Sequence, residues 1–382
     1  MAEAGAAPRP RLLFVVAEDW YFCSHRLHIA LAAKDAGFDV AVATRAKRDA
    51  DRITAAGLRL HPIGMRRGGL NPWRELTSFL ELLRIYRRER PDLAHHVAVK
   101  PVIYGSLAAR LAGVPRVVNA LAGLGFLFSS SSLKARLLRP LATLAYRLLL
   151  GGRGRVLILQ NADDRELFVR RGLAPAAGIR LIRGSGVDTD RYAPRPEPEG
   201  RPLVVLPARL LRDKGVGEFV AAARLLRARG IAARFALVGD VDPENPASIG
   251  REQLDAWQAE GVVEIWGCRD DMPEVLAGCA LVCLPSYREG LPKVLLEAAS
   301  CGRAIVATDV PGCREIVADG DSGLLVPPRD AAALAAALAT LLGDPALRRS
   351  MGERGRQRVL AEFAAEKVAA ATLAVYRELL AA

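Results

Sequence analysis

Aromatic residues make up only 5% of this 382-residue chain. Surfaces that bind nucleic acid usually interleave aromatic side chains with basic ones, so this scarcity disfavours a nucleic-acid-binding protein. The six cysteines show no C-x-x-C spacing. We interpret them as small core residues rather than as a disulfide framework or a zinc site.

Long apolar runs are also missing. No segment reaches the about 18 to 20 uncharged apolar residues that a membrane-spanning helix requires. The most apolar candidate, residues 137–150, is interrupted by Arg139, Pro140 and Arg147. The apolar run that follows the Ala/Pro-rich first ten residues is too short for a secretory signal and leads directly into Glu18. The sequence therefore predicts a cytoplasmic protein that does not span a membrane.

The charge of the chain is unevenly distributed. The net charge is +12, but residues 1–185 carry 30 Lys and Arg against 14 Asp and Glu, and the remainder carries 24 against 28. Anionic lipid headgroups attract basic clusters without needing aromatic partners. Two segments rich in leucine and arginine, 76–91 and 132–155, suit a membrane surface. They suit core helices with a solvated basic face equally well, and both interpretations stay open here.

The first half of the chain alternates short apolar runs with helical patterns. A first helix is expected at 25–37, ended by Gly37. Strands are expected at 11–17, 38–44, 59–64, 91–97, 116–121, 155–160 and 179–184. Strands that alternate with helices predict a parallel, doubly wound α/β sheet.

The stretch 192–202 carries four prolines and no apolar run, which is typical of a linker. We therefore expect an N-terminal domain over 1–190, a linker over 191–202, a second domain over 203–361 and a C-terminal helix over 362–382 that returns to the first domain. A helix is expected at 217–230, and strands at 202–210, 235–240, 262–267, 280–286, 304–309 and 323–328. Two Rossmann-like domains that face each other across a ligand cleft follow from this pattern.

Two glutamates, Glu289 and Glu297, lie eight positions apart in YREGLPKVLLEA. Pro292 between them favours a helix start, which places Glu289 in a loop and Glu297 in the second turn of the helix. The N-terminus of a helix attracts anions. The two carboxylates would then contact the uncharged parts of an anionic ligand that carries hydroxyl groups.

Two cations follow the strand at 202–207. Arg209 and Lys214 have R-x4-K spacing and end in Gly215, just before a helix. Such a pair at a helix entrance suits a diphosphate. Considered alone, the two cations would more often be solvated surface charges than ligand contacts. Their position at a strand end, together with Glu289 and Glu297, makes ligand contacts the favoured interpretation.

These elements resemble the retaining glycosyltransferases of family 4, which have the GT-B fold. The resemblance rests on ARLLRDKG (208–215), the VGD strand end (238–240) and SYREGLPKVLLEAASCGRAIVATDVPGCREIV (286–317), and it covers nearly the whole chain. In the first half, residues 17–44 and 100–128 are similar to a bacterial subgroup. That subgroup extends polyprenyl-diphosphate-linked sugars from UDP-sugars such as N-acetylgalactosamine or N-acetylglucosamine.

The resemblance implies a role for each matching residue. Arg209 and Lys214 would bind the donor diphosphate, Glu297 the ribose hydroxyls, and Glu289 the sugar being transferred. Further donor contacts are implied for Gly239, Asp240, Gly267, Leu291, Pro292, Lys293 and Val294. The family needs no divalent metal and no other cofactor.

The site implied in the first domain departs from the family pattern. The family has an H-x-H-like element after its fourth strand; here His95 and His96 are adjacent, and Val97 stands where the second histidine would be. Lys100 then becomes the better candidate for a phosphate contact, with His95 behind it. Both histidines fit the core of a strand end equally well.

Acceptor contacts are implied for two further segments of the first domain. The loop expected at 18–26 carries His25 and Arg26, and the glycine-rich segment 119–126 carries Gly123 and Gly125. Glycines there would let the backbone approach a substrate closely, but a simple chain bend accounts for them equally well.

Together these features predict a retaining transferase at the inner leaflet of the cytoplasmic membrane. It would move an N-acetylhexosamine or hexose from a UDP-sugar to an undecaprenyl-diphosphate-linked saccharide. A soluble or protein acceptor, or a non-catalytic protein that binds nucleic acid or membrane, is the alternative. A glycosidase would not need the Arg209 and Lys214 pair, and a dehydrogenase or epimerase would need a G-x-G-x-x-G after the first strand, which is missing.

Overall fold

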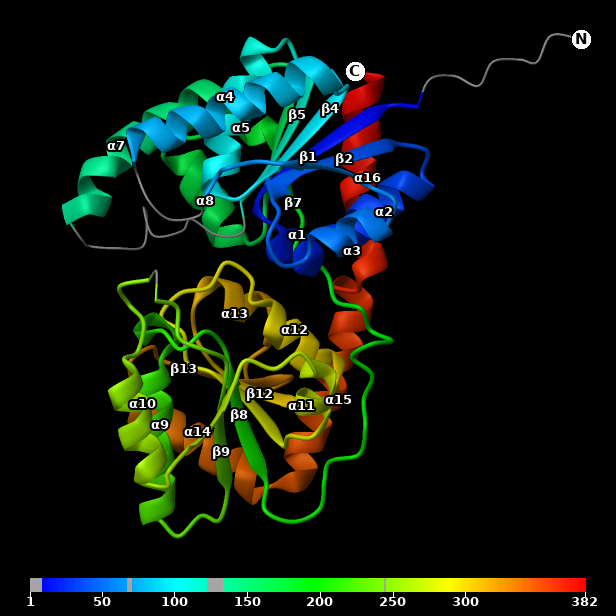
Figure 1. The fold of residues 1–382 in the computed structure, drawn as a ribbon. Coiled ribbons are helices and arrows are strands. Elements are labelled where there is room, and N and C mark those ends of the chain that lie inside the picture. Colours follow the sequence, from blue (N-terminus) through cyan, green and yellow to red (C-terminus); the bar gives the residue numbers. More distant parts are fainter. Residues whose placement is uncertain (1–8, 67–70, 122–132, 244) are drawn as a thin grey trace, which may run out of the picture. The chain divides into compact units, whose positions relative to one another are not determined.

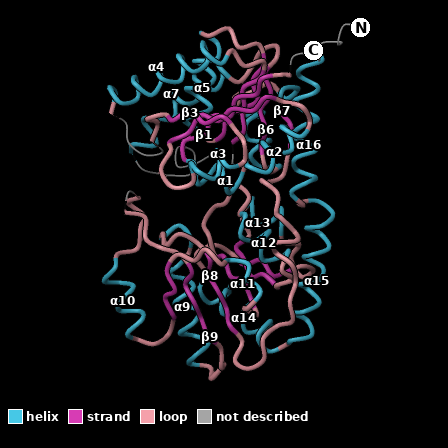
Figure 2. Tube along the Cα trace, turned by 45° about the vertical axis from the view of Figure 1, so that its right-hand side comes forward, coloured by secondary structure: helices cyan, strands magenta, loops and turns pink. Residues whose placement is uncertain are grey.

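The computed structural model describes residues 9–66, 71–121, 133–243 and 245–382. It divides into two compact units. Unit 1 combines the chain up to Ser185 with Glu366–Ala382, and unit 2 is Gly186–Ala365. Figure 1 follows the chain through both units, and Figure 2 shows that the strands of each unit form a layer with helices around it.

Unit 1 is built on a seven-stranded parallel sheet with strand order β3-β2-β1-β4-β5-β6-β7. Its strands are β1 (Arg11–Glu18), β2 (Asp39–Arg45), β3 (Arg59–Pro62), β4 (Leu93–Val97), β5 (Arg116–Leu121), β6 (Arg155–Leu159) and β7 (Ile179–Leu181). Its helices are α1 (Asp19–His25), α2 (Leu27–Asp35), α3 (Ala50–Ala55), α4 (Pro72–Glu89), α5 (Val99–Leu111), α7 (Leu133–Leu149), α8 (Ala162–Arg170) and α16 (Ala365–Ala381), with a short turn η1 (Ala176–Gly178).

Strand β1 shows why this sheet forms in the middle of unit 1. Six of its eight residues are buried, because helices cover both faces of the sheet. Leu12 and Phe14 pack in a core shared with α2 and α16, whereas Leu13 and Val15 pack in a core shared with α4 and α5. The continuous apolar run that predicted a buried strand is thus divided between two cores.

Unit 2 holds a six-stranded parallel sheet with strand order β10-β9-β8-β11-β12-β13. Its strands are β8 (Leu203–Pro207), β9 (Arg234–Val238), β10 (Glu264–Gly267), β11 (Leu281–Leu284), β12 (Ala304–Thr308) and β13 (Gly323–Val326). Its helical elements are η2 (Arg212–Lys214), α9 (Val216–Ala228), α10 (Arg251–Ala259), α11 (Met272–Ala277), α12 (Lys293–Ser300), α13 (Pro311–Ile316), α14 (Ala331–Gly343) and α15 (Pro345–Glu362).

All thirteen strands expected from the sequence are present, and the doubly wound α/β class is confirmed. One expectation about helices was wrong. The loop expected at 18–26 is mostly helix α1, which begins directly after β1. The C-terminal helix expected at 362–382 is present as α16, Ala365–Ala381, and it groups with unit 1.

The proline-rich stretch after residue 191 belongs to unit 2 instead of linking the units. Other segments of unit 2 donate hydrogen bonds to its carbonyl groups: Ser300 Oγ bonds the Tyr192 carbonyl at 2.8 Å, and an Arg303 nitrogen bonds the Arg195 carbonyl at 2.7 Å. Glu197 is paired with Arg348 at 2.5 Å. The proline-rich composition suggested a linker because the residues that donate these hydrogen bonds lie 108 positions away in the sequence.

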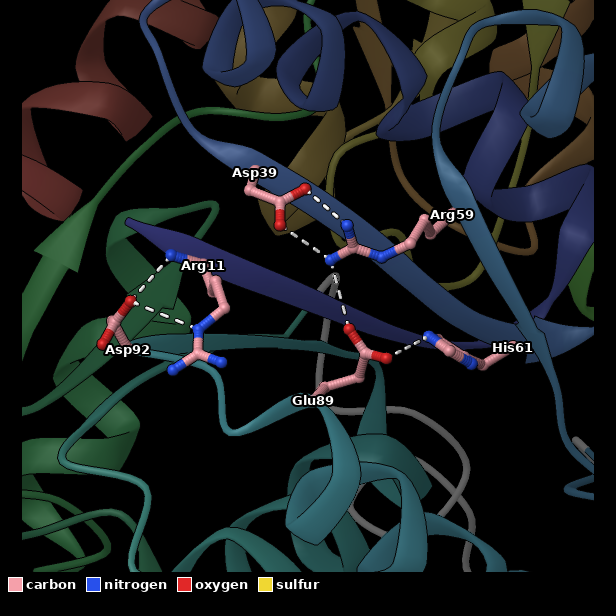
Figure 3. Close-up of polar contacts among 6 residues, drawn as sticks. All are labelled: Arg11, Asp39, Arg59, His61, Glu89 and Asp92. Carbon is pink, nitrogen blue, oxygen red and sulfur yellow. Dashed lines mark hydrogen bonds and ion pairs between the residues drawn. The ribbon is translucent and has the colours of Figure 1, made fainter. Parts of the chain in front are cut away.

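A polar cluster joins the edge of the unit 1 sheet at which the strands begin. Its members are Arg11, Asp39, Arg59, His61, Glu89 and Asp92 (Figure 3). Arg59 donates to both oxygens of Asp39, at 2.7 and 2.9 Å, and to Glu89 at 3.1 Å. Arg59 and Glu89 link the starts of β2 and β3 to the end of α4, and Arg11 separately pairs with Asp92 just before β4. The opposite edge, where the strands end, is left for ligands.

Candidate active site

The site of unit 2 lies where the strand order reverses. Strands β8 and β11 are neighbours, but the chain continues from β8 to β9 on one side and from β11 to β12 on the other. The loops that follow the two strands therefore diverge and leave a crevice, which is where open parallel sheets bind ligands. These loops carry Arg209 and Lys214 after β8, and Glu289 after β11.

The structure brings Lys214 and Glu289 together. The Lys214 ammonium group lies 2.5 Å from Glu289 Oε1, and the Ser286 hydroxyl donates to the same oxygen at 2.7 Å. The backbone N–H of Tyr287 donates to the Asp213 carbonyl at 2.9 Å and fastens one loop to the other. The Lys214 and Glu289 side chains are only 19% and 10% exposed, so the pair is held in a largely desolvated position.

Glycines allow these loops to approach so closely. Gly215 has φ +70°, and a Cβ there would lie 2.1 Å from the Pro285 carbonyl oxygen. Gly239, after β9, has φ +149°, and its Cβ would lie 1.9 Å from the Ala208 carbonyl oxygen. Its N–H donates to the Gly267 carbonyl at 2.8 Å. Three of the candidate donor contacts, Lys214, Gly239 and Gly267, therefore lie in loops whose backbones are in direct contact.

Arg209 has a partner that the sequence analysis did not identify. Its guanidinium donates to Asp242 Oδ2 at 2.6 Å. Asp242 lies in the polar loop after β9, two residues beyond the exposed Asp240. An incoming diphosphate would compete with the Asp242 carboxylate for this cation.

Glu297 lies in the second turn of α12, as Pro292 at the N-cap predicted. It is 8% exposed and 3.2 Å from the Lys293 ammonium group, one helical turn away. Burial, with a hydrogen bond to Glu297, raises the pKa of the Tyr192 phenol. Leu291 and Val294 border the adjoining core of unit 2, so the α12 entrance that should contact sugar and phosphate is firmly anchored.

His95 and His96 lie in the middle of the unit 1 core. His95 Nδ1 is hydrogen-bonded to the hydroxyl of Tyr376 from α16, and His96 is held between Tyr86 at 2.6 Å and Asn119 at 2.8 Å. Burial lowers the pKa of both imidazoles, for His96 to about 4. Both histidines are therefore neutral at pH 7, and their geometry fits a structural role rather than contact with the reacting sugar.

The other residues of unit 1 that the sequence singled out differ in burial and in their partners. Lys100, at the start of α5, lies 2.7 Å from the Glu75 carboxylate of α4 and remains 17% exposed. Arg26 is 3% exposed, and burial lowers its pKa, so its guanidinium is placed to support the fold. His25 stacks on Tyr21 with ring centroids 4.1 Å apart. Gly123 and Gly125 lie outside the described residues.

The described part of the chain also bears on metals and membranes. Within the described ranges, no group of three or more His, Cys, Asp or Glu side chains is placed to hold a metal ion. No single described helix is long and apolar enough to cross a bilayer. Helices α14 and α15 reach the necessary length and apolar composition only when taken together, and they meet at an angle of 102°.

Two family models match this chain. Glycosyl transferase 4-like matches residues 11–160, and glycosyl transferases group 1 matches residues 201–344. A curated relative from Campylobacter jejuni is 30% identical over 88% of this chain and 90% of its own length; it is N,N'-diacetylbacillosaminyl-diphospho-undecaprenol alpha-1,3-N-acetylgalactosaminyltransferase. The chain belongs to this family of glycosyltransferases.

Solved structures agree on the fold of this glycosyltransferase. Sucrose-phosphate synthase from Thermosynechococcus elongatus has a TM-score of 0.81 at 22% identity, covering 98% of this chain and all of its own. HepE from Anabaena in complex with UDP and glucose has a TM-score of 0.79 at 18% identity, covering 97% and 100%. The GT-B fold with two Rossmann-like domains is confirmed.

Sequence reasoning missed the partners of the cations in this glycosyltransferase. Asp242 and Glu75 hold Arg209 and Lys100, and Ser286 shares Glu289 with Lys214. The Ser286 contact could have been predicted from the sequence, because Ser286 lies only three residues before Glu289 in the same loop. The other two come from separate elements, and no spacing in the sequence signals them.

Proposed function

We propose that this glycosyltransferase moves a sugar from a UDP-sugar to a saccharide linked to undecaprenyl diphosphate, with retention of configuration at the anomeric carbon and without a metal ion. The Lys214–Glu289 pair at the reversal point of the unit 2 sheet carries the proposal. The pair places a cation and an anion side by side. A nucleotide-sugar donor has the complementary arrangement, because its negative diphosphate adjoins a sugar that becomes positive during transfer.

The charges match the changes that occur during transfer. As the bond from the anomeric carbon to the diphosphate oxygen breaks, negative charge grows on UDP and positive charge on the sugar ring. Lys214 and Arg209 stabilise the first, and Glu289 stabilises the second. The acceptor hydroxyl attacks on the face that the leaving group vacates and passes its proton to the departing diphosphate. Glu297 binds the ribose hydroxyls.

Two relatives support the choice of substrates. HepE has been solved with UDP and glucose bound, and its fold is that of this chain. The Campylobacter relative is named for an acceptor linked to diphospho-undecaprenol, and it matches this chain along nearly its whole length. These two names favour a UDP-sugar donor and a polyprenyl-diphosphate acceptor over a soluble or protein acceptor.

The surface of unit 1 supports a lipid-linked acceptor at a membrane. Twelve large hydrophobic side chains are exposed among the described residues, and eight of them lie on three helices that are neighbours, α4, α5 and α7. The eight are Trp73, Leu76, Leu80, Leu107, Leu111, Leu141, Leu144 and Leu148. Figure 1 shows the three helices together on one side of the unit 1 sheet. Such a concentration is unusual for a surface that meets only water.

Basic residues accompany these apolar ones. Along the outward face of α4, Trp73, Leu76 and Leu80 are followed at helical spacing by the exposed Arg84 and Arg87. Arg87 also lines a hollow of about 510 Å³ between the ends of α4 and α5. Apolar side chains that enter the interface, with arginines beside them for headgroup phosphates, fit an anionic membrane surface.

The variant Glu289→Gln tests the catalytic assignment. It keeps the shape of the side chain and its bond from Ser286 but removes the negative charge, so transfer should fall about 10²- to 10³-fold while UDP binding persists. The exposed Glu252→Gln on α10 is the matched control. Full transfer by Glu289→Gln, measured with a soluble short-chain diphosphate-linked acceptor, would exclude the role of Glu289.

The identity of the donor and the stereochemistry are tested separately. Thermal stabilisation by UDP-, GDP- and ADP-sugars should be largest for one UDP-sugar. The anomeric configuration of the product, measured by NMR, should equal that of the donor. An inverted product would contradict the proposed mechanism even if the substrates are correct.

A further inference from the structure

The unit 1 sheet has its own reversal point, between β1 and β4. Directly after β1 stands Asp19, whose carboxylate is completely buried. Its Oδ2 accepts N–H bonds from Lys47 at 2.6 Å, Arg48 at 2.8 Å and Asp49 at 3.0 Å. Three backbone donors on one oxygen attach residues 47–49, which follow β2, to the start of α1.

The charge state of Asp19 maintains this arrangement. Burial by itself raises the pKa of a carboxyl group, but the backbone hydrogen bonds from Lys47, Asp49 and Arg48 outweigh it, and the pKa of Asp19 is lowered. Asp19 is therefore ionised at neutral pH. Because the N–H groups of the segment are occupied, an anion can meet only its side chains, and those of Lys47 and Arg48 are exposed.

An aromatic residue is attached to the same carboxylate as this segment: the Trp20 N–H donates to Asp19 Oδ1 at 2.8 Å, and the Lys47 and Arg48 N–H groups donate to Oδ2. Trp20 follows Asp19 directly and is 37% exposed. Its ring meets Tyr21 edge-on, with centroids 5.8 Å apart, and Tyr21 in turn stacks on His25 at 4.1 Å. In a chain with 5% aromatic residues, three connected rings at the end of a central strand are noteworthy. Supported on Tyr21, the Trp20 ring offers a rigid apolar surface to a ligand.

We propose that Trp20, Lys47 and Arg48 form the site for the sugar–diphosphate portion of the acceptor. The acceptor's first sugar packs its C–H face on the Trp20 indole, and Lys47 and Arg48 bind the diphosphate that links this sugar to the lipid. The inference deepens the proposed function and rests on it, because it names the residues that recognise the acceptor class stated there.

Neighbouring carboxylates do not oppose a bound diphosphate strongly. Glu18 is paired with Arg45 at 3.5 Å, and Asp49 with Arg52 at 3.6 Å. The charge of Asp19 is satisfied by its backbone donors. These pairings reduce the repulsion that each carboxylate would exert on an arriving dianion.

Binding measured without donor tests the inference independently of transfer. The probe is a monosaccharide linked through diphosphate to a short, soluble prenyl chain, and the readout is its dissociation constant by calorimetry. Trp20→Ala should weaken binding about tenfold, equivalent to about 1.4 kcal/mol, whereas Trp20→Phe should restore most of the affinity. The double variant Lys47→Gln/Arg48→Gln should weaken binding of the diphosphate-linked probe more than binding of the same sugar linked through a single phosphate.

Controls separate this inference from the proposed function. Arg170→Gln removes an exposed charge from α8 of the same unit and should leave the dissociation constant unchanged. Donor affinity should be equal in all variants, which also shows that they are folded. If wild-type protein binds the probe and the Trp20 and Lys47/Arg48 variants bind it equally well, this inference is wrong and the proposed function stands. If wild-type protein does not bind the probe but transfers sugar to it when donor is present, this inference is wrong and the proposed function stands; if it neither binds the probe nor transfers sugar to it, both are wrong.

Discussion

Lys214 and Glu289 form an ion pair 2.5 Å across, although they are 75 positions apart and belong to the loops after β8 and β11. Each side chain fixes the orientation of the other before any donor is present. Such preorganisation is valuable in a site that stabilises charge, because little reorientation is then needed during the reaction. The pair and the other contacts described above can be tested by substitution, by pH and by vesicle binding.

Removing the cation should impair transfer more than removing a neighbouring charge. In Lys214→Met, the leaving diphosphate loses a counter-charge and Glu289 is left without its cation, so we expect kcat/KM for the donor to fall about 10²- to 10³-fold. Arg212→Gln, in the same short turn η2 but exposed, is the matched control and should change it less than threefold. Similar losses in both variants would mean that net charge alone matters.

The Asp242 carboxylate should act as a competitor of the donor. Since Arg209 donates to Asp242 at 2.6 Å, the donor diphosphate must replace this partner. Asp242→Asn keeps the shape of the side chain and weakens the competition, so KM for the donor should fall severalfold, with kcat unchanged. A rise in KM would show instead that Asp242 orients Arg209 for the donor.

Acid should destabilise unit 1 through its buried histidines. The pKa values of His95 and His96 are lowered by burial, for His96 to about 4, whereas an unfolded histidine titrates near 6.5. Between these values the unfolded chain binds protons that the folded unit does not. The free energy of unfolding should therefore be highest above about pH 7 and fall by about 1.4 kcal/mol per pH unit for each histidine as the pH decreases.

Urea unfolding at several pH values between 7.5 and 5 measures this slope. His96→Asn should reduce the slope by about one proton per molecule, whatever it does to stability at pH 7.5. An unchanged slope in the variant would show that other groups cause the acid sensitivity.

The exposed face of α4, α5 and α7 should bind anionic vesicles but not neutral ones. Replacing Arg84, Arg87 and Arg88 with Gln should weaken that binding by about 1 kcal/mol for each charge, and added salt should reduce the difference. Leu144→Gln/Leu148→Gln on α7 should weaken binding at every salt concentration, because the lost contribution is apolar. Cosedimentation with vesicles of both compositions measures each effect.

A charge-matched triple variant on unit 2 is the control for this experiment. It replaces the exposed residues Arg229, Arg251 and Arg349 with Gln. If this variant loses as much vesicle affinity as the α4 variant, the attraction comes from net charge and the α4–α5–α7 face is not the docking surface.

The sequence predicted most of the fold, because parallel strands buried on both faces appear as apolar runs between turn residues. A short apolar run such as that of β12, which is buried along its whole length, is typical of a central parallel strand. The sequence also placed Arg209, Lys214 and Glu289 correctly at strand ends, because strand ends are local features. The helix α1 was missed because Asp19 is stabilised by the segment at 47–49, which the sequence around Asp19 does not show.

Long-range partners account for what could not be predicted. His95 is held by Tyr376, which is 281 positions away, and Lys100 by Glu75 on another helix. The leucine and arginine patterns of α4 and α7 suited a membrane surface and a core helix equally well, and the exposed Leu107 and Leu111 of α5 join those of α4 and α7 only through packing between helices. Side-chain pairs of this kind depend on the assembled sheet, so no local pattern encodes them.

Helix α16 makes the order of synthesis differ from the order of assembly. Leu373, Tyr376 and Leu379 complete a core of unit 1, yet the ribosome translates them after all of unit 2. A nascent chain that has just finished Ala365 therefore holds every residue of unit 2 but leaves part of one face of the first sheet, the part that α16 covers, without its partner. During translation, the second unit is the first that can finish folding, and a chaperone would find the exposed apolar surface on the N-terminal half.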